Sequence, residues 1–220
     1  MIGVVMRLAA VLLLCPTAGR LLAQEPLETK LVVEQSGREI GREELTLVRR
    51  GQGPVSSSLK AAARYPADHP TLKLAATLER TPEGALAKFQ LEVDGPNGTT
   101  VILAAGSGAR LIIRTVAKGS EAGRELPGGP DIVLLDDQVF SLYCAVADQA
   151  TPGGKALTAV FPRTNRRASF VARRESGGDG GNTRVTLAGD INGTLVTDAQ
   201  GRLFRLELPE TGTVVSRAKD

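Results

Sequence analysis

The chain has 220 residues, of which 42% are hydrophobic and 23% charged, with 27 basic and 24 acidic side chains. This composition excludes a disordered or collagen-like polymer, and beyond the N-terminus no apolar run is long enough to cross a bilayer as a helix. With 25 glycines, 12 prolines and 3% aromatic residues, the sequence predicts a turn-rich globular protein whose core is built from aliphatic side chains.

Residues 1–23 are predicted to be an export signal. Arg7 precedes a compact apolar run over residues 8–15, and Pro16 and small residues follow that run. This is the order of regions in a secretory signal peptide. We therefore expect an exported protein, either periplasmic or secreted.

Removal of the signal changes both the charge and the cysteine count. Cleavage after Ala23, with Ala18 as the alternative, removes two arginines and no acid, which leaves 25 basic against 24 acidic residues. A chain this close to neutrality makes no general case for nucleic acid as a partner. Cys144 is then the single cysteine, so the predicted mature chain has no internal disulfide. Residues 24–220 are expected to fold as a single β domain.

The sequence pattern predicts about a dozen short strands in the mature chain. Apolar and polar residues alternate with a period of two, and turn residues recur about every 8 to 12 positions, which is typical of antiparallel sheet. The expected strands are residues 30–35, 39–49, 55–63, 72–79, 88–93, 101–103, 111–117, 156–161, 168–174, 183–188, 194–197, 203–208 and 213–217.

Turn chemistry predicts how two pairs of these strands are joined. Residues 94–98 read Asp-Gly-Pro-Asn-Gly, and residues 191–193 read Ile-Asn-Gly. Glycine and asparagine accept a positive φ, which tight turns between antiparallel strands require. Both segments are therefore predicted to be hairpin turns.

One segment departs from the strand pattern and predicts a helix near residues 136–147. Asp136 is expected to cap its start. Val139, Leu142 and Tyr143 share one face at positions i, i+3 and i+4, and further apolar residues widen that face. Because such a helix must be covered on several sides, we expect a strongly curved antiparallel sheet, or an incomplete β-barrel, to wrap around it.

Three segments resemble those of uncharacterised secreted bacterial proteins. Residues 31–47, with Gly37 and Gly41 in a Gly-x-x-x-Gly pattern, resemble their opening hairpin. Residues 135–143, LDDQVFSLY, are similar to their central helix, and residues 198–217 resemble their closing hairpin. Such proteins are similar in architecture to the Lol-type carriers of lipoproteins, in which an incomplete β-barrel holds a helix. The resemblance implies that an acyl chain or lipid is bound inside the barrel.

The expected function is the non-enzymatic binding of an apolar ligand, a lipid or acyl chain, between the helix and the curved sheet. Candidate lining residues are large, apolar and predicted to point inward, and each is equally consistent with a packing role in a filled core. They are Phe89, Leu135, Val139, Leu142, Tyr143 and Phe204. No cofactor is implied by the sequence.

The alternative is a structural or interaction module of the bacterial envelope, with a filled core and a surface that binds a protein partner. The densest group of cations supplies a candidate surface, because guanidinium groups bind phosphate and carboxylate well. An anionic lipid head or membrane surface is the other ligand considered for it. This group comprises Arg163, Arg166, Arg167, Arg173 and Arg174.

Catalytic chemistry is not indicated. His69, the single histidine, lies in a Pro-rich turn and has no predicted partner. One histidine and one mature cysteine cannot supply the usual ligands of a zinc site. Cys144 falls on the apolar face of the predicted helix, where a thiol acts as packing. Asp136 and Asp137 are adjacent on the predicted helix start, so we expect a role in capping rather than paired acid and base catalysis.

Overall fold

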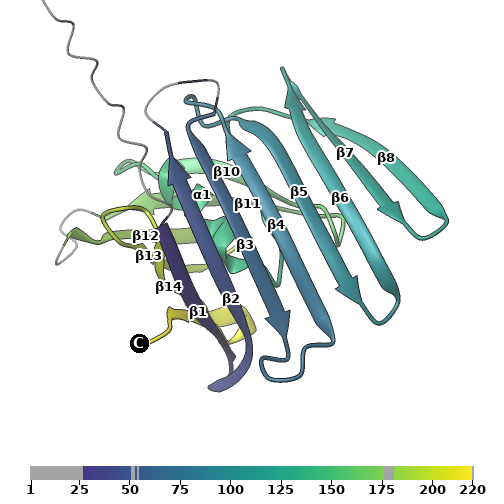
Figure 1. Ribbon diagram of the computed structural model, residues 1–220. Coiled ribbons are helices and arrows are strands. Elements are labelled where there is room, and N and C mark those ends of the chain that lie inside the picture. The colour runs from purple at the N-terminus through teal and green to yellow at the C-terminus, as the bar shows by residue number, and fades with distance from the viewer. Residues whose placement is uncertain (1–26, 51–52, 54, 176–180, 220) are drawn as a thin grey trace, which may run out of the picture.

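The computed structural model describes residues 27–50, 53, 55–175 and 181–219 (Figure 1). The predicted export signal, residues 1–23, lies outside the described residues. The first eight strands are β1 (Leu27–Gln35), β2 (Arg38–Arg49), β3 (Ser57–Tyr65), β4 (Leu72–Arg80), β5 (Leu86–Gly95), β6 (Gly98–Ser107), β7 (Arg110–Ala117) and β8 (Ser120–Pro127).

The second part of the chain holds the helical elements and shorter strands. In chain order it contains β9 (Ile132–Leu134), the 3-10 helix η1 (Phe140–Tyr143), α1 (Cys144–Gln149), β10 (Lys155–Phe161), β11 (Arg166–Arg174), β12 (Thr183–Gly189), β13 (Gly193–Thr197), β14 (Leu203–Leu208), the 3-10 helix η3 (Pro209–Thr211) and β15 (Thr213–Arg217). The prediction of a mainly β protein is confirmed. Within the described residues, no helix is long and apolar enough to cross a membrane.

The fifteen strands of the described residues form one sheet, in the order β8-β7-β6-β5-β4-β3-β2-β1-β15-β14-β13-β12-β11-β10-β9. The sheet is open, with β8 and β9 as its edge strands. Neighbours are antiparallel except for β9 and β10, which are parallel. The sheet is therefore mainly antiparallel, as expected, and mixed at this edge. The physical reason is that the chain between β9 and β10 forms a long crossover through the helical segment, which parallel strands require.

The two predicted hairpin turns are confirmed. Gly95 pairs with Gly98 at the end of β5 and β6, and the chain reverses between β12 and β13 around Asn192. The asparagine side chain stabilises the second turn, since its amide bonds both the N–H and the carbonyl of Gly189.

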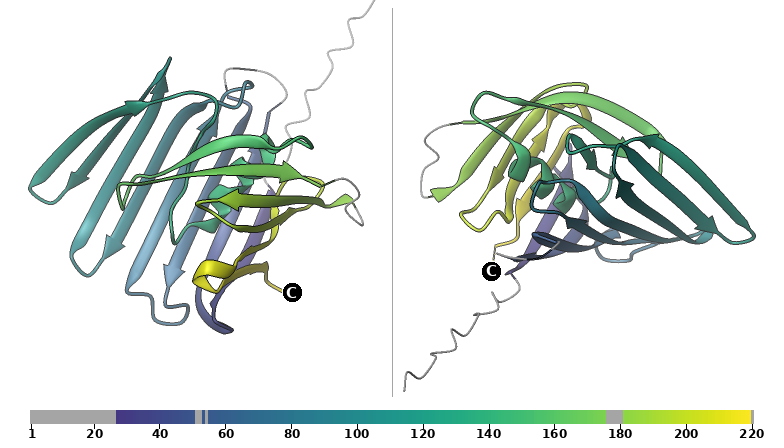
Figure 2. Two further views of the ribbon diagram at one scale, coloured as in Figure 1. Left: turned by 180° about the vertical axis from the view of Figure 1, so that it is seen from behind. Right: turned by 90° about the horizontal axis from the view of Figure 1, so that it is seen from above.

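The sheet buries one face of nearly every strand. Residues alternate between buried and exposed along β2, β3 and β4, as the period-two pattern predicts. Figure 2 shows the shorter strands β10–β14 crossing the inner face of the longer strands at the start of the chain. The buried side chains of both groups form one contiguous hydrophobic core.

The helical segment is shorter at its start and longer at its end than predicted. Residues 136–139 form a tight turn, η1 begins at Phe140, and α1 ends at Gln149. The apolar character is confirmed, because all four residues of η1 and most of α1 are buried. η1 packs against β2, β3 and β14, and α1 packs against β11 and β13.

Candidate functional site

The turn before the helical segment is held by its own aspartate. The Asp136 Oδ1 atom accepts a hydrogen bond from the Gln138 backbone N–H at 2.9 Å. Val139 is the residue before η1, and its side chain makes no capping hydrogen bond. The prediction that Asp136 caps the helix is therefore wrong. Its carboxylate already accepts a hydrogen bond within the turn, and the first helical residue, Phe140, lies three residues later than the prediction required.

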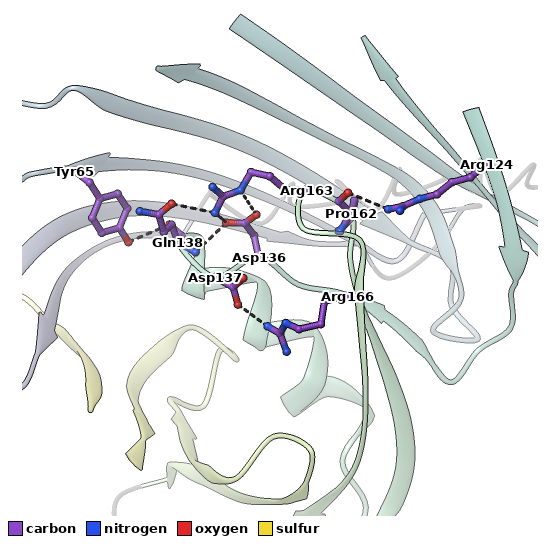
Figure 3. A network of polar contacts seen from close by, with 8 residues as sticks. All are labelled: Tyr65, Arg124, Asp136, Asp137, Gln138, Pro162, Arg163 and Arg166. Carbon is purple, nitrogen blue, oxygen red and sulfur yellow. Dashed lines mark hydrogen bonds and ion pairs between the residues drawn. The ribbon is translucent and has the colours of Figure 1, made fainter. Parts of the chain in front are cut away.

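Asp136 also forms a two-point ion pair with Arg163, which lies in the turn between β10 and β11 (Figure 3). Arg163 Nε and Nη2 donate to Asp136 Oδ2 and Oδ1, both at 2.8 Å, and Arg163 Nη2 also donates to Gln138 Oε1 at 3.0 Å. The Asp136 side chain is only 1% exposed. These bonds to Asp136 raise the pKa of Arg163, so the guanidinium stays charged. The network ties residues 136–138 to the β10–β11 turn.

Tyr65, at the end of β3, connects this turn to the long strands. Its hydroxyl donates to the Gln138 backbone carbonyl at 3.0 Å, and burial raises the pKa of the phenol above its usual range. The tyrosine ring lies against Gly41 on β2, where a Cβ atom would clash with it. The second glycine of the Gly-x-x-x-Gly pattern thus has a packing role, because it leaves room for the ring.

Glu43 of β2 caps the helical segment in place of Asp136. Its two carboxylate oxygens accept hydrogen bonds from the backbone N–H groups of Phe140 and Ser141, each at 2.9 Å. The residue is 1% exposed, and burial raises the pKa of its carboxyl to about 7, although these hydrogen bonds favour the charged form. A nearby carboxylate, Asp136, contributes further to the rise. Glu43 therefore satisfies two N–H groups that would otherwise be buried without partners.

A pocket of about 310 Å³ opens beside this network. It lies between the tip of the β1–β2 hairpin, the 136–140 segment and the β14–β15 connection. One part of its wall is apolar, and the rest carries hydroxyl, amide and carboxylate groups. The lining residues are Gln35, Ile40, Tyr65, Asp136, Asp137, Gln138, Phe140, Tyr143, Leu208, Thr211 and Thr213.

Five of the six predicted lining residues are buried. Phe89, Leu135, Val139 and Leu142 are fully inaccessible and belong to the core, while Tyr143 is 3% exposed and also lines the pocket. The structure thus brings only Tyr143 of the six to this pocket.

The inward direction predicted for Phe204 is wrong, because its side chain is 43% exposed. The pairing of β13 with β14 shifts register between Val196 and Thr197, so that three residues of β14 oppose two of β13. Such a bulge changes which residues face inward. Leu203 and Leu206 enter the core, and Phe204 lies outside with the Arg217 guanidinium 5.5 Å from its ring centre.

The five predicted cationic residues do not form one cluster. Arg163 is bound to Asp136, and Arg166 bonds Asp137 at 2.6 Å while stacking on Phe161. The others are exposed along β11, with Arg167 near its start and Arg173 and Arg174 at its end. A strand rises about 3.3 Å per residue, so the two ends are about 25 Å apart. Closeness in sequence did not become closeness in space because the segment is extended.

A further arginine links the edge strand β8 to the same turn. Arg124 donates to the carbonyl of Pro162 at 2.9 Å (Figure 3). It also donates to the side chain of Asn165. The β10–β11 turn is therefore held from two sides, by β8 and by the 136–138 segment.

The remaining polar candidates take the positions expected for them. His69 is exposed in the β3–β4 loop, and Cys144 is buried, with burial raising the pKa of its thiol. Among the described residues, no group of three histidine, cysteine, aspartate or glutamate side chains is placed to hold a metal ion.

Sequence reasoning missed Glu43, Tyr65 and Gln138. A signal for the first was present, because Glu43 shares the inward parity of Leu45 and Leu47 in an alternating strand. An acid at such a position must find donors inside the protein. The identity of those donors, 97 positions further along the chain, could not be read from the sequence.

Comparison with known proteins leaves the chain without an assigned family. No protein-family profile matches it, and no curated protein matches it. Among solved structures it is similar to a DUF1089 family protein from Pseudomonas aeruginosa, with 13% sequence identity, a TM-score of 0.43, and coverage of 94% of this chain and 97% of that chain. A likeness at this level carries no argument about activity.

Proposed function

We propose that the protein is an exported, non-enzymatic carrier or binding protein for an apolar ligand, a lipid or acyl chain. The ligand enters at the pocket between the hairpin tips and the start of the helical segment. The proposal rests on the wall of this pocket, which is apolar on one side and polar on the other. Ile40, Phe140, Tyr143 and Leu208 offer apolar surface, and Tyr65 stands on the polar side.

The pocket's size and position support this proposal. Its volume of about 310 Å³ lies at the lower end of the range of small-molecule sites, about 300–1,000 Å³. Ile40 and Leu208 are half-buried and pack directly against the core. A ligand chain in the pocket would therefore extend the core rather than lie on a polar surface.

We further propose that the two groups of strands act as an incomplete barrel around the helical segment. Supporting this, η1 and α1 together pack on strands from both parts of the sheet, and their side chains are buried. The resemblance to secreted proteins of the Lol-type architecture supports the same class of function.

The test is uptake of a neutral fluorescent acyl probe by the protein purified without detergent, together with native mass spectrometry. We expect saturable 1:1 binding and, if ligand is retained from the cell, an adduct that is released as lipid on denaturation. Leu208→Lys places a charge in the apolar wall and should weaken uptake by roughly tenfold or more.

Ile112→Lys is the matched control, because Ile112 is an exposed apolar residue on β7, outside the pocket. It should leave uptake unchanged. A wild-type protein that ignores the probe, or equal weakening by both substitutions, would overturn the proposal and favour the envelope interaction module with a filled core.

A further inference from the structure

A second hollow is lined by residues of the opposite face of the long strands. This face of the sheet is turned toward the viewer in Figure 1. The hollow is a groove of about 530 Å³ across β2, β3, β4 and β5. Its lining is rich in charge, with alanines between the charged residues. The lining residues are Arg42, Glu44, Ala62, Ala63, Arg64, Pro70, Lys73, Leu74, Ala75, Glu92 and Asp94.

The strand register places three cations side by side in this groove. Arg42 of β2 pairs with Arg64 of β3, and Arg64 pairs with Lys73 of β4, all on the exposed face. Like charges directly opposite one another in a sheet are destabilising. The row therefore carries a small electrostatic cost in the folded protein.

Within this row, acidic residues adjoin the cations at the two ends. Arg42 Nε donates to Glu39 at 2.7 Å, and Asp94 is the register partner of Lys73. Arg64, in the centre, forms no ion pair or side-chain hydrogen bond with the residues that the structure describes. The middle of the cationic row is thus open to an anion from solution.

A second row runs parallel to the first and is displaced from it by two residues on each strand. Glu44 pairs with Ala62, Ala62 with Ala75, and Ala75 with Glu92. Ala62 and Ala75 lie in the middle of this row and have small side chains. Glu44 and Glu92 lie at its two ends. Residues i and i+2 of a strand are about 6.8 Å apart, so this is the separation between the cationic row and the acidic row.

We infer that this groove binds short zwitterionic peptides, with the carboxylate at Arg64 and the ammonium group between Glu44 and Glu92. An extended chain spans about 3.3–3.6 Å per residue, so the ends of a dipeptide are about 7 Å apart and match the two rows. The ammonium group then lies over Ala62 and Ala75, whose small side chains leave it room. Side chains of the peptide point to solvent, so the site recognises the two charged ends rather than a particular sequence.

The test is a titration of the isotope-labelled protein with alanyl-alanine, followed by amide chemical shifts. We expect saturable shifts confined to the exposed face of β2–β5. N-acetyl-alanyl-alanine lacks the ammonium group and alanyl-alanine amide lacks the carboxylate, so each should bind roughly tenfold more weakly or worse.

Two substitutions locate the site, and a third serves as the control. Arg64→Gln and Glu92→Gln should each weaken binding of alanyl-alanine by roughly tenfold. Lys60→Gln removes a cation from the same face of β3, opposite Thr46 and Thr77 and outside the groove, and should leave binding unchanged.

Three results would overturn the inference. The first is the absence of saturable shifts at millimolar dipeptide, the second is equal binding of the free and end-blocked peptides, and the third is equal binding by wild type and Arg64→Gln. None of these results bears on acyl-probe uptake, because the acyl pocket and the groove lie on opposite faces of the strands and share no residue.

Discussion

The inner and outer faces of β2 and β3 use adjacent charged residues in opposite ways. On the inner face, Glu43 is 1% exposed and bonds two backbone N–H groups of the helical segment. On the outer face, its neighbours Arg42 and Glu44 are exposed and line the groove together with Arg64. Adjacent residues of one strand thus have different roles: Glu43 anchors the helical segment, whereas Arg42 and Glu44 belong to a charged surface.

The difference shows how burial changes what a charge does. A buried carboxylate must be matched by specific donors, so its removal affects stability strongly. An exposed charge is screened by water, so it adds little to stability alone and acts through its neighbours on the surface.

The largest effect is expected for Glu43→Ala. This change leaves two buried N–H groups without acceptors, so the free energy of unfolding should fall by about 3–4 kcal/mol. Glu44→Ala, one residue away on the exposed face, should change it by at most about 0.5 kcal/mol. Urea unfolding of both variants measures the contrast, and similar losses would show that Glu43 does not anchor the helical segment.

The free energy of unfolding should depend on pH because Glu43 titrates at a different pH in the folded and the unfolded protein. The folded protein holds the Glu43 proton up to about pH 7, whereas the unfolded chain releases it near its usual pKa of 4.5. The folded state therefore binds more protons between these values, and the stability that Glu43 contributes falls as the pH rises through this window. The expected loss is about 3 kcal/mol between pH 4.5 and 7.

Glu43→Gln isolates this contribution, because glutamine accepts a hydrogen bond but does not titrate. The difference in unfolding free energy between wild type and Glu43→Gln should shift in favour of the variant as the pH rises from 4.5 to 7. A difference that stays constant over this range would mean that Glu43 titrates normally in the folded protein.

A smaller loss is expected for Gly41→Ala. The added methyl group would meet the Tyr65 ring and lie 2.9 Å from the Arg64 carbonyl oxygen, which should lower the free energy of unfolding by about 2 kcal/mol. Gly123→Ala on β8 is the control, since no atom lies within 4 Å of its added Cβ. If the two substitutions have equal effects in urea unfolding, the close approach of Tyr65 to β2 is not a constraint.

The smallest effect is expected for a substitution on the outer face, which should raise the free energy of unfolding and not lower it. Arg64→Gln relieves repulsion from Arg42 and Lys73, so the free energy of unfolding should rise by at most about 0.5 kcal/mol at low salt. Added salt screens the repulsion and should remove the gain. A clear loss of stability would indicate that Arg64 makes a stabilising contact instead.

The alternation of apolar and polar residues predicted most strands and the direction of their side chains, because that alternation reflects burial on one face of a sheet. Phe89 is an example, since its predicted inward position is confirmed. Phe204 shows where the same rule stops, because a bulge in the pairing with β13 changed which residues of β14 face the core. A bulge depends on the partner strand, which the local pattern does not contain.

The polar contacts around the helical segment likewise could not be predicted from the local sequence pattern. The sequence by itself determined that the chain is mainly β, that two glycine-rich turns are hairpins and that the segment near residues 136–147 is apolar enough to be buried. Only the tertiary structure decided that Glu43, rather than Asp136, caps the helical segment and that Asp136 binds Arg163. The reason is that alternation and turn chemistry act between near neighbours, whereas a buried charge selects its partner from whatever residues the completed fold brings within hydrogen-bonding distance.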